Sequence, residues 1–355
     1  MEPVTHILTG AVLSRAGLNR RTAYATVAMM IAAEFPDVDL LAAISGPVAG
    51  LEHHRGITHT LVGIPFEAAL ITAGFYAWHR FRKPHAGPPK SKVPPAWGWL
   101  FGATLLALLS HLLLDWTNNY GLRPFFPFNP HWYAGSFVFI FEPLLFLMLV
   151  LALILPALFG LINAEVGARK PVFRGRASAI AALVGIAALY LFRYDQRNQA
   201  ILHARSVAPA DTSRVFASPY PLDPFKWHMV TDTPGAYLLS TVNNRSGEDP
   251  VVEETLYKSP STMEELVAKR TYLGRIYLDW SQYPVLTQVP ETTDPNHPLT
   301  AVTFSDARFY YSVSLLHGLP EHGAPPILSG TVLLDMTAPE GQRVVETRMD
   351  GRLEK

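Results

Sequence analysis

The stretch 137–162 reads FVFIFEPLLFLMLVLALILPALFGLI and is longer than the roughly 20 apolar residues that a helix needs to cross a bilayer. It forms most of the apolar run Ser136–Ile162. Three further runs of comparable character are Thr60–Trp78, Gly98–Trp116 and Ala177–Phe192. Four such runs before residue 193 favour a membrane domain over a soluble core, so we expect about four transmembrane helices.

The composition divides the chain into two halves. Charged residues make up 16% of its 355 residues, below the roughly 25% of a soluble domain. Residues 1–199 hold 16 of the 29 basic and 10 of the 29 acidic residues, a net +6, so residues 200–355 carry −6. The absence of cysteine excludes a disulfide scaffold and Cys-ligated zinc or iron–sulfur sites. No basic stripe interleaved with aromatics is present, so we expect no nucleic-acid partner.

The basic residues of the loops predict an orientation. Segments 79–96 and 163–176 hold nine Lys and Arg residues, whereas segment 117–135 holds only Arg123. The positive-inside rule places the first two segments in the cytoplasm and the third outside. We therefore expect a multi-pass protein of the inner (plasma) membrane whose C-terminal domain is extracytoplasmic.

Two shorter apolar segments, residues 4–14 and 22–33, flank Arg15, Arg20 and Arg21. They predict two short helices that enter the bilayer and return, lie in the interface, or pack on the other helices. The start is not typical of a signal peptide, because it has no basic residues and His6 interrupts the apolar part.

The pattern changes near Ser206 to short strands separated by Pro, Gly, Asn and Asp turns. The expected strands are Trp227–Val230, Ala236–Val242, Val285–Val289, Leu299–Phe304, Phe309–Leu315, Thr331–Met336 and Arg343–Arg348. A helix is expected over 262–278, with Ser261 and Glu264 at capping-box spacing. We thus predict a helical membrane domain over 1–198 and an α+β, mostly β, domain over 199–355.

The start of the second domain suggests a further role. The segment 223–228 contains Trp227 and His228, which suit contact with lipid headgroups and with a site beneath them. We therefore expect this domain to cover the site as a lid. The alternative is that Trp227 belongs to the core and His228 to the surface.

Polar and charged residues are scarce in the apolar half, so those that are present are candidates for a functional site. His111 and Asp115 stand at i and i+4, so a helix presents both on one face. Asp37 and Asp39 follow Pro36, which ends the preceding helix, and a turn there lets both carboxylates converge. Oxygen donors at such a point suit a divalent cation, although a His–Asp hydrogen bond and a solvated turn are the simpler alternatives.

A third motif, residues 54–59, precedes the first long run. Gly56 allows a turn, so His54 and His59 can meet from a loop, and His53 could replace His54. Arg55 suits an anionic phosphate or carboxylate. The alternative is an ordinary basic loop beside the membrane.

The expected topology places the three motifs on the outer side, and His6 joins them if the N-terminal helices are re-entrant. The predicted metal ligands are His6, Asp37, Asp39, His54, His59, His111 and Asp115. Nitrogen and oxygen donors without cysteine suit one or two divalent ions, Zn²⁺ or Mn²⁺. Glu67 and Glu142 are the only acids expected deeper in the membrane.

These motifs, together with Thr5-His6 and Gly10, resemble the family of membrane-bound metal-dependent hydrolases described as inner-membrane hydrolases of unsettled substrate. The resemblance covers residues 1–195. More distantly, the His111/Asp115 pair, His59 and the Asp37/Asp39 turn are similar to ligands of the helical zinc-dependent phospholipase C group. That group has a further HxxxE pair, but here Val138 precedes Glu142 by four residues, so one or two ions are expected rather than three.

The leading hypothesis is a membrane hydrolase that cleaves an ester or phosphodiester of a lipid or lipid-linked substrate with a metal-activated water. Asp37 would act as general base and Arg55 would hold the anionic charge of the substrate. Two alternatives are a metal- or ion-binding transporter and a non-catalytic membrane anchor for the C-terminal domain. Membrane lipid is the expected partner.

Overall fold

The computed structural model describes residues 1–82, 93–165, 175–258, 260–291, 298–311 and 326–354. The chain forms two compact units that are not continuous in sequence. The helical unit comprises Met1–Asp39, Arg55–Gln196 and Pro219–Pro224. The sheet unit comprises Leu40–His54, Arg197–Ser218 and Phe225–Lys355.

The helical unit begins with the two predicted short helices. They are α1 (Pro3–Arg15) and α2 (Ala25–Glu34), joined through the 3₁₀ helix η1 (Leu18–Arg20). The Glu2 side chain caps α1 by accepting hydrogen bonds from two backbone N–H groups of the first turn. The helices approach so closely that a Cβ at Gly10 would lie 2.4 Å from the Met29 carbonyl oxygen. Glycine at position 10 is therefore required by this packing.

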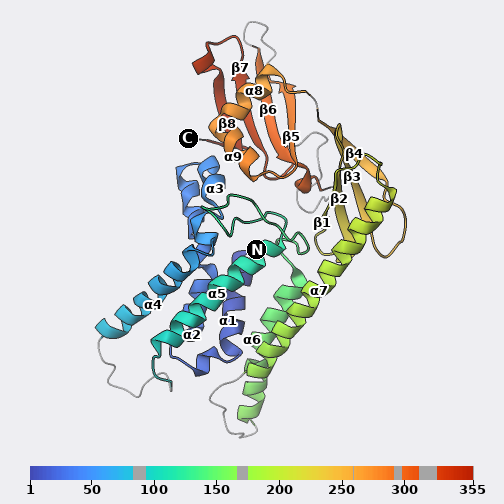
Figure 1. Cartoon of the computed structure of the whole chain (residues 1–355). Coiled ribbons are helices and arrows are strands. Elements are labelled where there is room, and N and C mark those ends of the chain that lie inside the picture. The colour runs from blue at the N-terminus through green and yellow to red at the C-terminus, as the bar shows by residue number, and fades with distance from the viewer. Residues whose placement is uncertain (83–92, 166–174, 259, 292–297, 312–325, 355) are drawn as a thin grey trace. The chain divides into compact units, whose positions relative to one another are not determined.

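Long apolar helices complete the unit (Figure 1): α4 (Gly63–Phe81), α5 (Trp97–Thr117), α6 (Pro143–Glu165) and α7 (Arg176–Val207). Three of them, α5, α6 and α7, are long and apolar enough to cross a membrane. A fourth span is possible if α4 is counted together with the bent segment Pro47–His59 before it. Large exposed side chains such as Phe66, Leu70 and Trp78 on α4 suit contact with lipid.

The third predicted run is helical only from Pro143 onward. Ser136 has a left-handed backbone (φ 53°), and the N–H groups of Phe137 and Val138 both donate to the Thr117 carbonyl oxygen. The guanidinium of Arg193, which lies on α7, donates to the Phe137 carbonyl oxygen at 3.1 Å. Phe137, Val138 and Phe139 are buried, and the backbone of this stretch bonds to neighbouring segments rather than within a helix.

The core of the helical unit consists mainly of small and aliphatic residues from α2, α4 and α5. Ala28, Ala32 and Ala103 are almost completely buried, and they let the helix backbones come close together. This close packing brings the start of the segment after α2 next to the end of α5.

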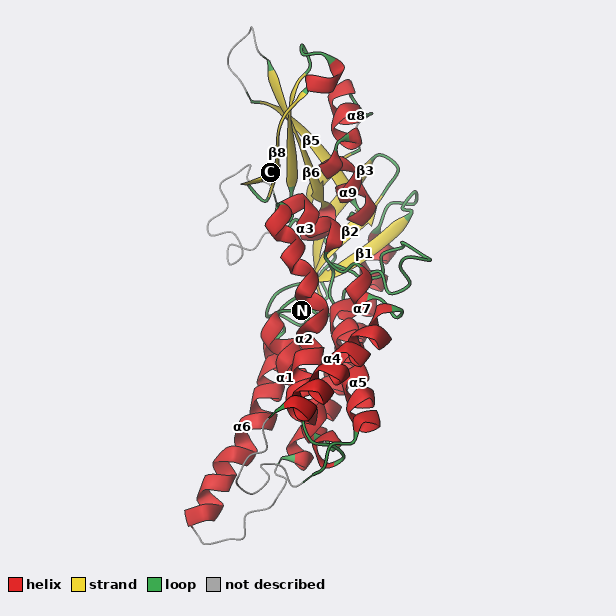
Figure 2. Ribbon diagram, turned by 90° about the vertical axis from the view of Figure 1, so that its left-hand side faces the viewer, coloured by secondary structure: helices red, strands yellow, loops and turns green. Residues whose placement is uncertain are grey.

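The sheet unit contains two antiparallel sheets (Figure 2). The first has the order β1 (Arg214–Pro219), β2 (Lys226–Asp232), β3 (Ala236–Asn243) and β4 (Val252–Tyr257). The second has the order β5 (Pro284–Pro290), β6 (Leu299–Asp306), β7 (Gly330–Asp335), β8 (Val344–Met349) and β9 (Arg352–Leu353). Phe216, Val230 and Val285 belong to one hydrophobic core that joins the two sheets.

Six of the seven expected strands are present with small shifts of their ends. The seventh, Phe309–Leu315, is absent over 309–311, where the 3₁₀ helix η4 (Ala307–Phe309) ends, and its remainder lies outside the described residues. The sequence pattern missed β1, β4 and β9. The β4 sequence VEETLY has adjacent glutamates and mostly exposed residues, so its pairing with β3, rather than its composition, makes it a strand.

The expected helix over 262–278 is two helices, α8 (Met263–Arg270) and α9 (Tyr272–Trp280). The predicted capping residue is wrong by one position. Thr262, not Ser261, accepts the hydrogen bond from the Glu265 N–H, because the buried Glu265 fixes where α8 begins. Thr271 separates the helices and caps α9 by accepting from the Gly274 N–H.

One segment near the predicted metal motifs belongs to the sheet unit. Helix α3 (Pro47–His53) packs against α9. Glu354 accepts a hydrogen bond from the Val48 N–H at 2.8 Å, and the Tyr272 hydroxyl donates to Glu52. The chain therefore leaves the helical unit after Asp39 and returns at Arg55.

The predicted headgroup contact through Trp227 and His228 is wrong. Both residues lie in β2 and are buried, Trp227 completely and His228 to all but 2%. The imidazole Nε2 of His228 lies 2.9 Å from the Ala307 carbonyl oxygen within the same unit. These adjacent residues point to opposite faces of β2, and five consecutive residues of the strand are buried, so both of its faces are covered and both side chains are removed from water.

A buried ion pair joins β6 to the start of η4. The Arg308 guanidinium donates to both carboxylate oxygens of Asp306 at 2.8 and 2.9 Å, and both residues are fully buried. Asp306 also accepts from the Ser281 hydroxyl at 2.6 Å. Burial by itself raises the pKa of Asp306, but the charge of Arg308 and these hydrogen bonds hold it below its ordinary range.

We predict that Asp306→Asn destabilises the sheet unit by about 3 kcal/mol, because it leaves the Arg308 charge buried without its partner. Urea denaturation of the full chain, followed by tryptophan fluorescence, measures this change. Glu346→Gln, which removes the partner of the exposed Arg348, is the control and should leave the midpoint unchanged. The pKa of Asp306 is lower in the folded protein than in the unfolded chain, where it is about 4. The stabilisation by the ion pair is therefore fully present above about pH 4 and is lost as the pH falls through the pKa of folded Asp306. Equal midpoints for both variants would contradict this account.

Candidate metal centre

Four segments of the helical unit carry the predicted site residues. His6 lies on α1, and His111 and Asp115 lie on the last turns of α5. Asp37 and Asp39 lie in the 3₁₀ helix η2 (Phe35–Ser45), and His59 ends the 3₁₀ helix η3 (Ile57–His59).

The local sequence explains how these segments present their side chains. Pro36 has no N–H group, so α2 ends at Glu34 and the chain continues as a 3₁₀ helix that carries both aspartates. The turn before His59 includes Arg55, which has a left-handed backbone (φ 56°). It also includes Gly56, the residue expected from the sequence, whose ψ of −135° is neither helical nor extended. The Arg55 N–H donates to Asp39 Oδ2 at 2.8 Å and holds this conformation in place.

Asp37, His59, His111 and Asp115 form one His–Asp cluster that could hold a metal ion, since one ligand atom of each lies within 4.8 Å of the others. His59 Nε2 lies 3.0 Å from His111 Nε2. It also lies 3.3 Å from Asp37 Oδ1 and 3.5 Å from Asp115 Oδ2. His59, His111 and Asp115 are at most 1% exposed, whereas Asp37 is less buried.

The hydrogen bonds of the Nδ1 atoms of His59 and His111 determine which ring nitrogens face the centre of the cluster. His111 Nδ1 lies 2.7 Å from the Ala33 carbonyl oxygen, which can only accept, so Nδ1 carries the proton. His59 Nδ1 lies 3.0 Å from Asp39 Oδ2, which likewise only accepts. In the neutral rings both Nε2 atoms then present lone pairs to each other and to two carboxylate oxygens. A metal ion bound between these atoms, or a proton on one of the Nε2 atoms, would remove the repulsion between the acceptors.

Asp39 lies behind His59, where it can orient the imidazole, and its predicted ligation of a metal stays a prediction. Its Oδ2 atom also accepts from the Thr58 hydroxyl at 3.0 Å. A carboxylate behind a ligating imidazole fixes the tautomer and the ring orientation of the histidine. Asp37, in contrast, faces the cluster. Burial by itself raises the pKa of Asp37, but the hydrogen bond with His59 and the proximity of His111 hold it below its ordinary value.

His6 lies at the edge of the cluster. Its ring stacks on His111 with centroids 3.9 Å apart, and its Nε2 atom lies 3.4 Å from Asp115 Oδ1. The amino group of Met1 contacts the same carboxylate oxygen. Neither ring nitrogen of His6 has a hydrogen-bond partner among the described residues, although the side chain is fully buried. His6 is therefore available as a further nitrogen donor.

Arg55 is part of the support of the cluster. Its Nε atom lies 3.0 Å from Asp115 Oδ2, and its Nη1 atom donates to the Gly121 carbonyl oxygen at 2.7 Å and to Asn118 Oδ1 at 3.2 Å. The guanidinium also stacks on the Tyr120 ring at 4.7 Å. The geometry favours orientation of Asp115 as its role, and the predicted contact with a substrate stays a prediction.

Two other histidines were predicted near the site. His53 is exposed and lies 3.7 Å from Glu52, and His54 is half-buried. Both belong to the part of the chain that joins the sheet unit. Ligation by His54, and the choice between His54 and His53, stay predictions.

Sequence reasoning did not assign Glu67 to the site. This residue lies on the first turns of α4, is 8% exposed, and has one carboxylate oxygen without a hydrogen-bond partner among the described residues. His59 and Asp39 are the nearby charges that act on it. An acid inside an apolar helix, two turns after a candidate ligand, was the signal that could have placed it here.

We predict a graded loss of metal binding in purified full-length protein. His59→Ala or His111→Ala removes a nitrogen donor and should weaken Zn²⁺ binding at least about 100-fold, whereas Asp39→Asn, which acts behind His59, should cost about 10- to 100-fold. Competition with a chromogenic chelator gives the affinities, and elemental analysis gives the stoichiometry.

His79→Ala is the matched control, because His79 lies in the same unit and bonds to the Tyr24 hydroxyl outside the cluster. It should bind metal like the unsubstituted protein. The metal assignment fails if the loaded protein holds no stoichiometric divalent ion, or if His59→Ala and His79→Ala bind equally.

Comparison with known proteins gives a membrane family without a stated activity. Residues 1–200, which include every predicted site residue, match the model of the family described as YdjM inner membrane protein. The uncharacterized protein YfhP of Bacillus subtilis is 26% identical over 155 residues, which are 41% of this chain and 43% of that protein. The chain thus spans less than half the length of the curated relative that it matches.

No solved structure matches the chain. Neither description names a hydrolase or a phospholipase C, so the resemblance to those groups is not supported by the matches. The family match covers more than half of the 355 residues. The chain belongs to the YdjM inner membrane protein family.

Proposed function

We propose that the helical unit is a membrane-embedded metal-dependent hydrolase. The observation that supports this most directly is the facing pair of imidazole Nε2 atoms, 3.0 Å apart, with carboxylate oxygens 3.3–3.6 Å away. Nitrogen and oxygen donors without sulfur suit Zn²⁺ or Mn²⁺, one ion or two. A divalent ion bound there would lower the pKa of a bound water and make it a nucleophile near neutral pH.

The residues of the chain have distinct parts in this proposal. His59, His111 and Asp115 hold the ion, and Arg55 and Asp39 keep two of these ligands in their orientation. Asp37 is the most accessible carboxylate of the cluster, so it is placed to take the proton of the attacking water. Glu67 is a second buried carboxylate that could accept this proton.

The proposed substrate is an ester or phosphodiester of a lipid or lipid-linked molecule. Three or four helices of the chain are long and apolar enough to span a membrane, and the family is described as an inner membrane protein. A cluster at the end of α5 lies near the boundary of such a span, where lipid headgroups are found.

We propose that the end of the helical unit that bears the cluster faces outward, together with the C-terminus. Nine basic residues in segments 79–96 and 163–176 against one in 117–135 support this orientation. Alkaline phosphatase and green fluorescent protein fusions at residues 88 and 355 should give opposite signals. Matching signals at the two positions would contradict the proposed topology.

The activity prediction concerns Asp37. With Zn²⁺ or Mn²⁺ bound, the protein should hydrolyse bis-p-nitrophenyl phosphate or phospholipid phosphodiesters, and Asp37→Asn should lower kcat by about 100-fold or more. Glu67→Gln tests the second carboxylate, and Glu253→Gln, an exposed acid of the sheet unit, is the control.

The same preparations separate the proposal from its alternatives. Metal-bound protein that hydrolyses no ester but moves the ion into vesicles would indicate a transporter. Protein that binds no metal and hydrolyses nothing would indicate an anchor for the sheet unit.

A further inference from the structure

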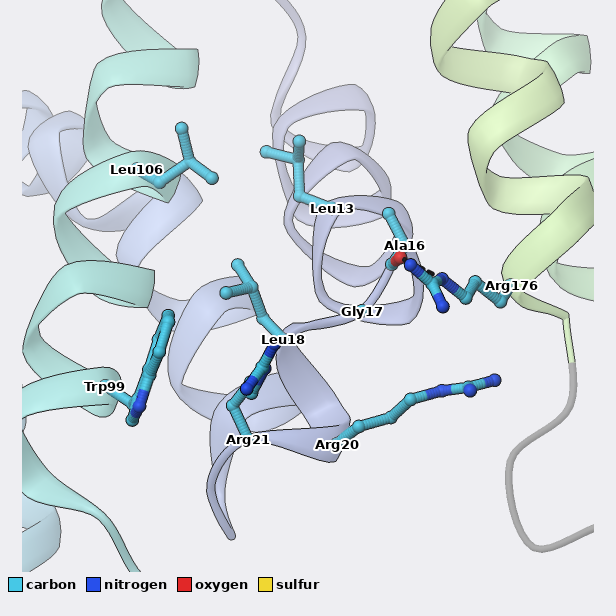
Figure 3. Close-up of a pocket in the computed structure, with 9 residues that line it drawn as sticks. All are labelled: Leu13, Ala16, Gly17, Leu18, Arg20, Arg21, Trp99, Leu106 and Arg176. Atoms are coloured by element: carbon cyan, nitrogen blue, oxygen red, sulfur yellow. Dashed lines mark hydrogen bonds between the residues drawn. The ribbon is translucent and has the colours of Figure 1, made fainter.

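The helical unit contains a second polar site that the His–Asp cluster does not use. A cavity of about 580 Å³ lies between the end of α1, the segment after it, the start of α5 and the start of α7 (Figure 3). This volume falls in the range of about 300–1,000 Å³ that is usual for small-molecule sites. We call this cavity the basic pocket.

Three guanidinium groups and no acidic side chain are found among the described residues that line the basic pocket. Arg20 and Arg21 come from the segment after α1, and Arg176 comes from the start of α7 (Figure 3). Among the described residues, only the Ala16 carbonyl oxygen accepts a hydrogen bond from Arg176, at 3.1 Å. Its other N–H groups thus remain available for an anion, and guanidinium groups suit the oxygens of a phosphate.

The remaining wall of the basic pocket is apolar. Leu13 and Leu18 are half-buried, and Leu106 is 42% exposed. Trp99 is 51% exposed and is covered on one face by Arg21, whose guanidinium lies 5.1 Å from the ring centroid. Tryptophan at the end of a membrane helix is typical of the level of the headgroups. A ligand with an anionic head and an apolar tail would match both the arginines and the apolar wall of the basic pocket.

The basic pocket and the His–Asp cluster lie at opposite ends of the same helices. On α1, the pocket is lined by Leu13 and His6 lies near the other end. On α5, Trp99 and His111 are twelve residues apart, which corresponds to about 18 Å along the axis. Helices α5 and α7 begin at the pocket end, and each follows in the sequence a basic segment that the positive-inside rule assigns to the cytoplasm, where the leaflet surface is anionic.

We propose that the basic pocket binds the phosphate group of an anionic phospholipid of the cytoplasmic leaflet. Arg20 and Arg176 hold the phosphate oxygens, and Leu13, Leu18 and Leu106 contact the upper part of an acyl chain. The proposal is independent of hydrolysis at the cluster, because it needs neither metal nor turnover.

Binding of fluorescent phosphatidylglycerol to the full-length protein in detergent tests this site. The unsubstituted protein should prefer phosphatidylglycerol to phosphatidylcholine. Arg20→Gln combined with Arg176→Gln should weaken phosphatidylglycerol binding at least about tenfold, at roughly 1 kcal/mol for each basic residue. Arg80→Gln combined with Arg82→Gln removes the same charge from exposed residues of the same unit outside the pocket and should leave binding unchanged.

Competition with inorganic phosphate identifies the source of the anion. Phosphate at millimolar concentration should not displace the lipid if the apolar wall contributes. Displacement by phosphate alone, equal binding of both lipids, or equal effects of the two double variants would each overturn the proposal. An unchanged circular dichroism spectrum and metal content of the variants exclude misfolding as the cause.

A second measurement leaves the arginines in place. Brominated phosphatidylglycerol in vesicles should quench the tryptophan fluorescence of the protein more than brominated phosphatidylcholine does, and this difference should shrink in Trp99→Phe. A difference that Trp99→Phe leaves unchanged would place the bound lipid elsewhere and overturn the assignment.

Discussion

The helical unit is organised around two imidazole nitrogens that face each other at a buried centre. His59 Nε2 and His111 Nε2 lie 3.0 Å apart, and the groups behind each ring fix this orientation. Two such nitrogen atoms, both unprotonated, would repel one another in a buried place unless a metal ion or a proton lay between them. The arrangement is therefore a property of the fold that a metal ion would complete, and each of the segments that meet there contributes to it.

The support of these ligands comes from residues that have no direct place in the cluster. The Ala33 carbonyl oxygen at the end of α2 fixes His111, Asp39 fixes His59, and Arg55 fixes Asp115. Because α1 and α2 meet where Gly10 contacts Met29, the position of His6 depends on the same packing. Ligand geometry and helix packing are thus linked, as expected where second-layer groups orient the ligands of a metal.

Charged side chains of opposite sign lie at opposite ends of the helices of this unit. Carboxylates and imidazoles gather at one end of α1 and α5, and three arginines line the basic pocket at the other end. In the proposed topology, this distribution would place the candidate cation site at one membrane surface and the proposed site for an anionic headgroup at the other. The segment Leu40–His54 leaves the helical unit after Asp39 and returns to it at Arg55, so the chain passes between the two units at both of these points.

The sequence by itself determined the apolar helices, the change to strands after them, and the pairing of His111 with Asp115, because helix periodicity and apolar length are local properties. The i, i+4 spacing places both side chains on one face of a helix, whatever other segments lie nearby. Only the tertiary structure decided that Asp39 and Arg55 support the ligands, that Glu67 lies near His59, and that Trp227 and His228 are buried. These roles depend on which segments meet in space. For the same reason, Arg176 lies beside Arg20 and Arg21 in the basic pocket, although it is far from them in the sequence.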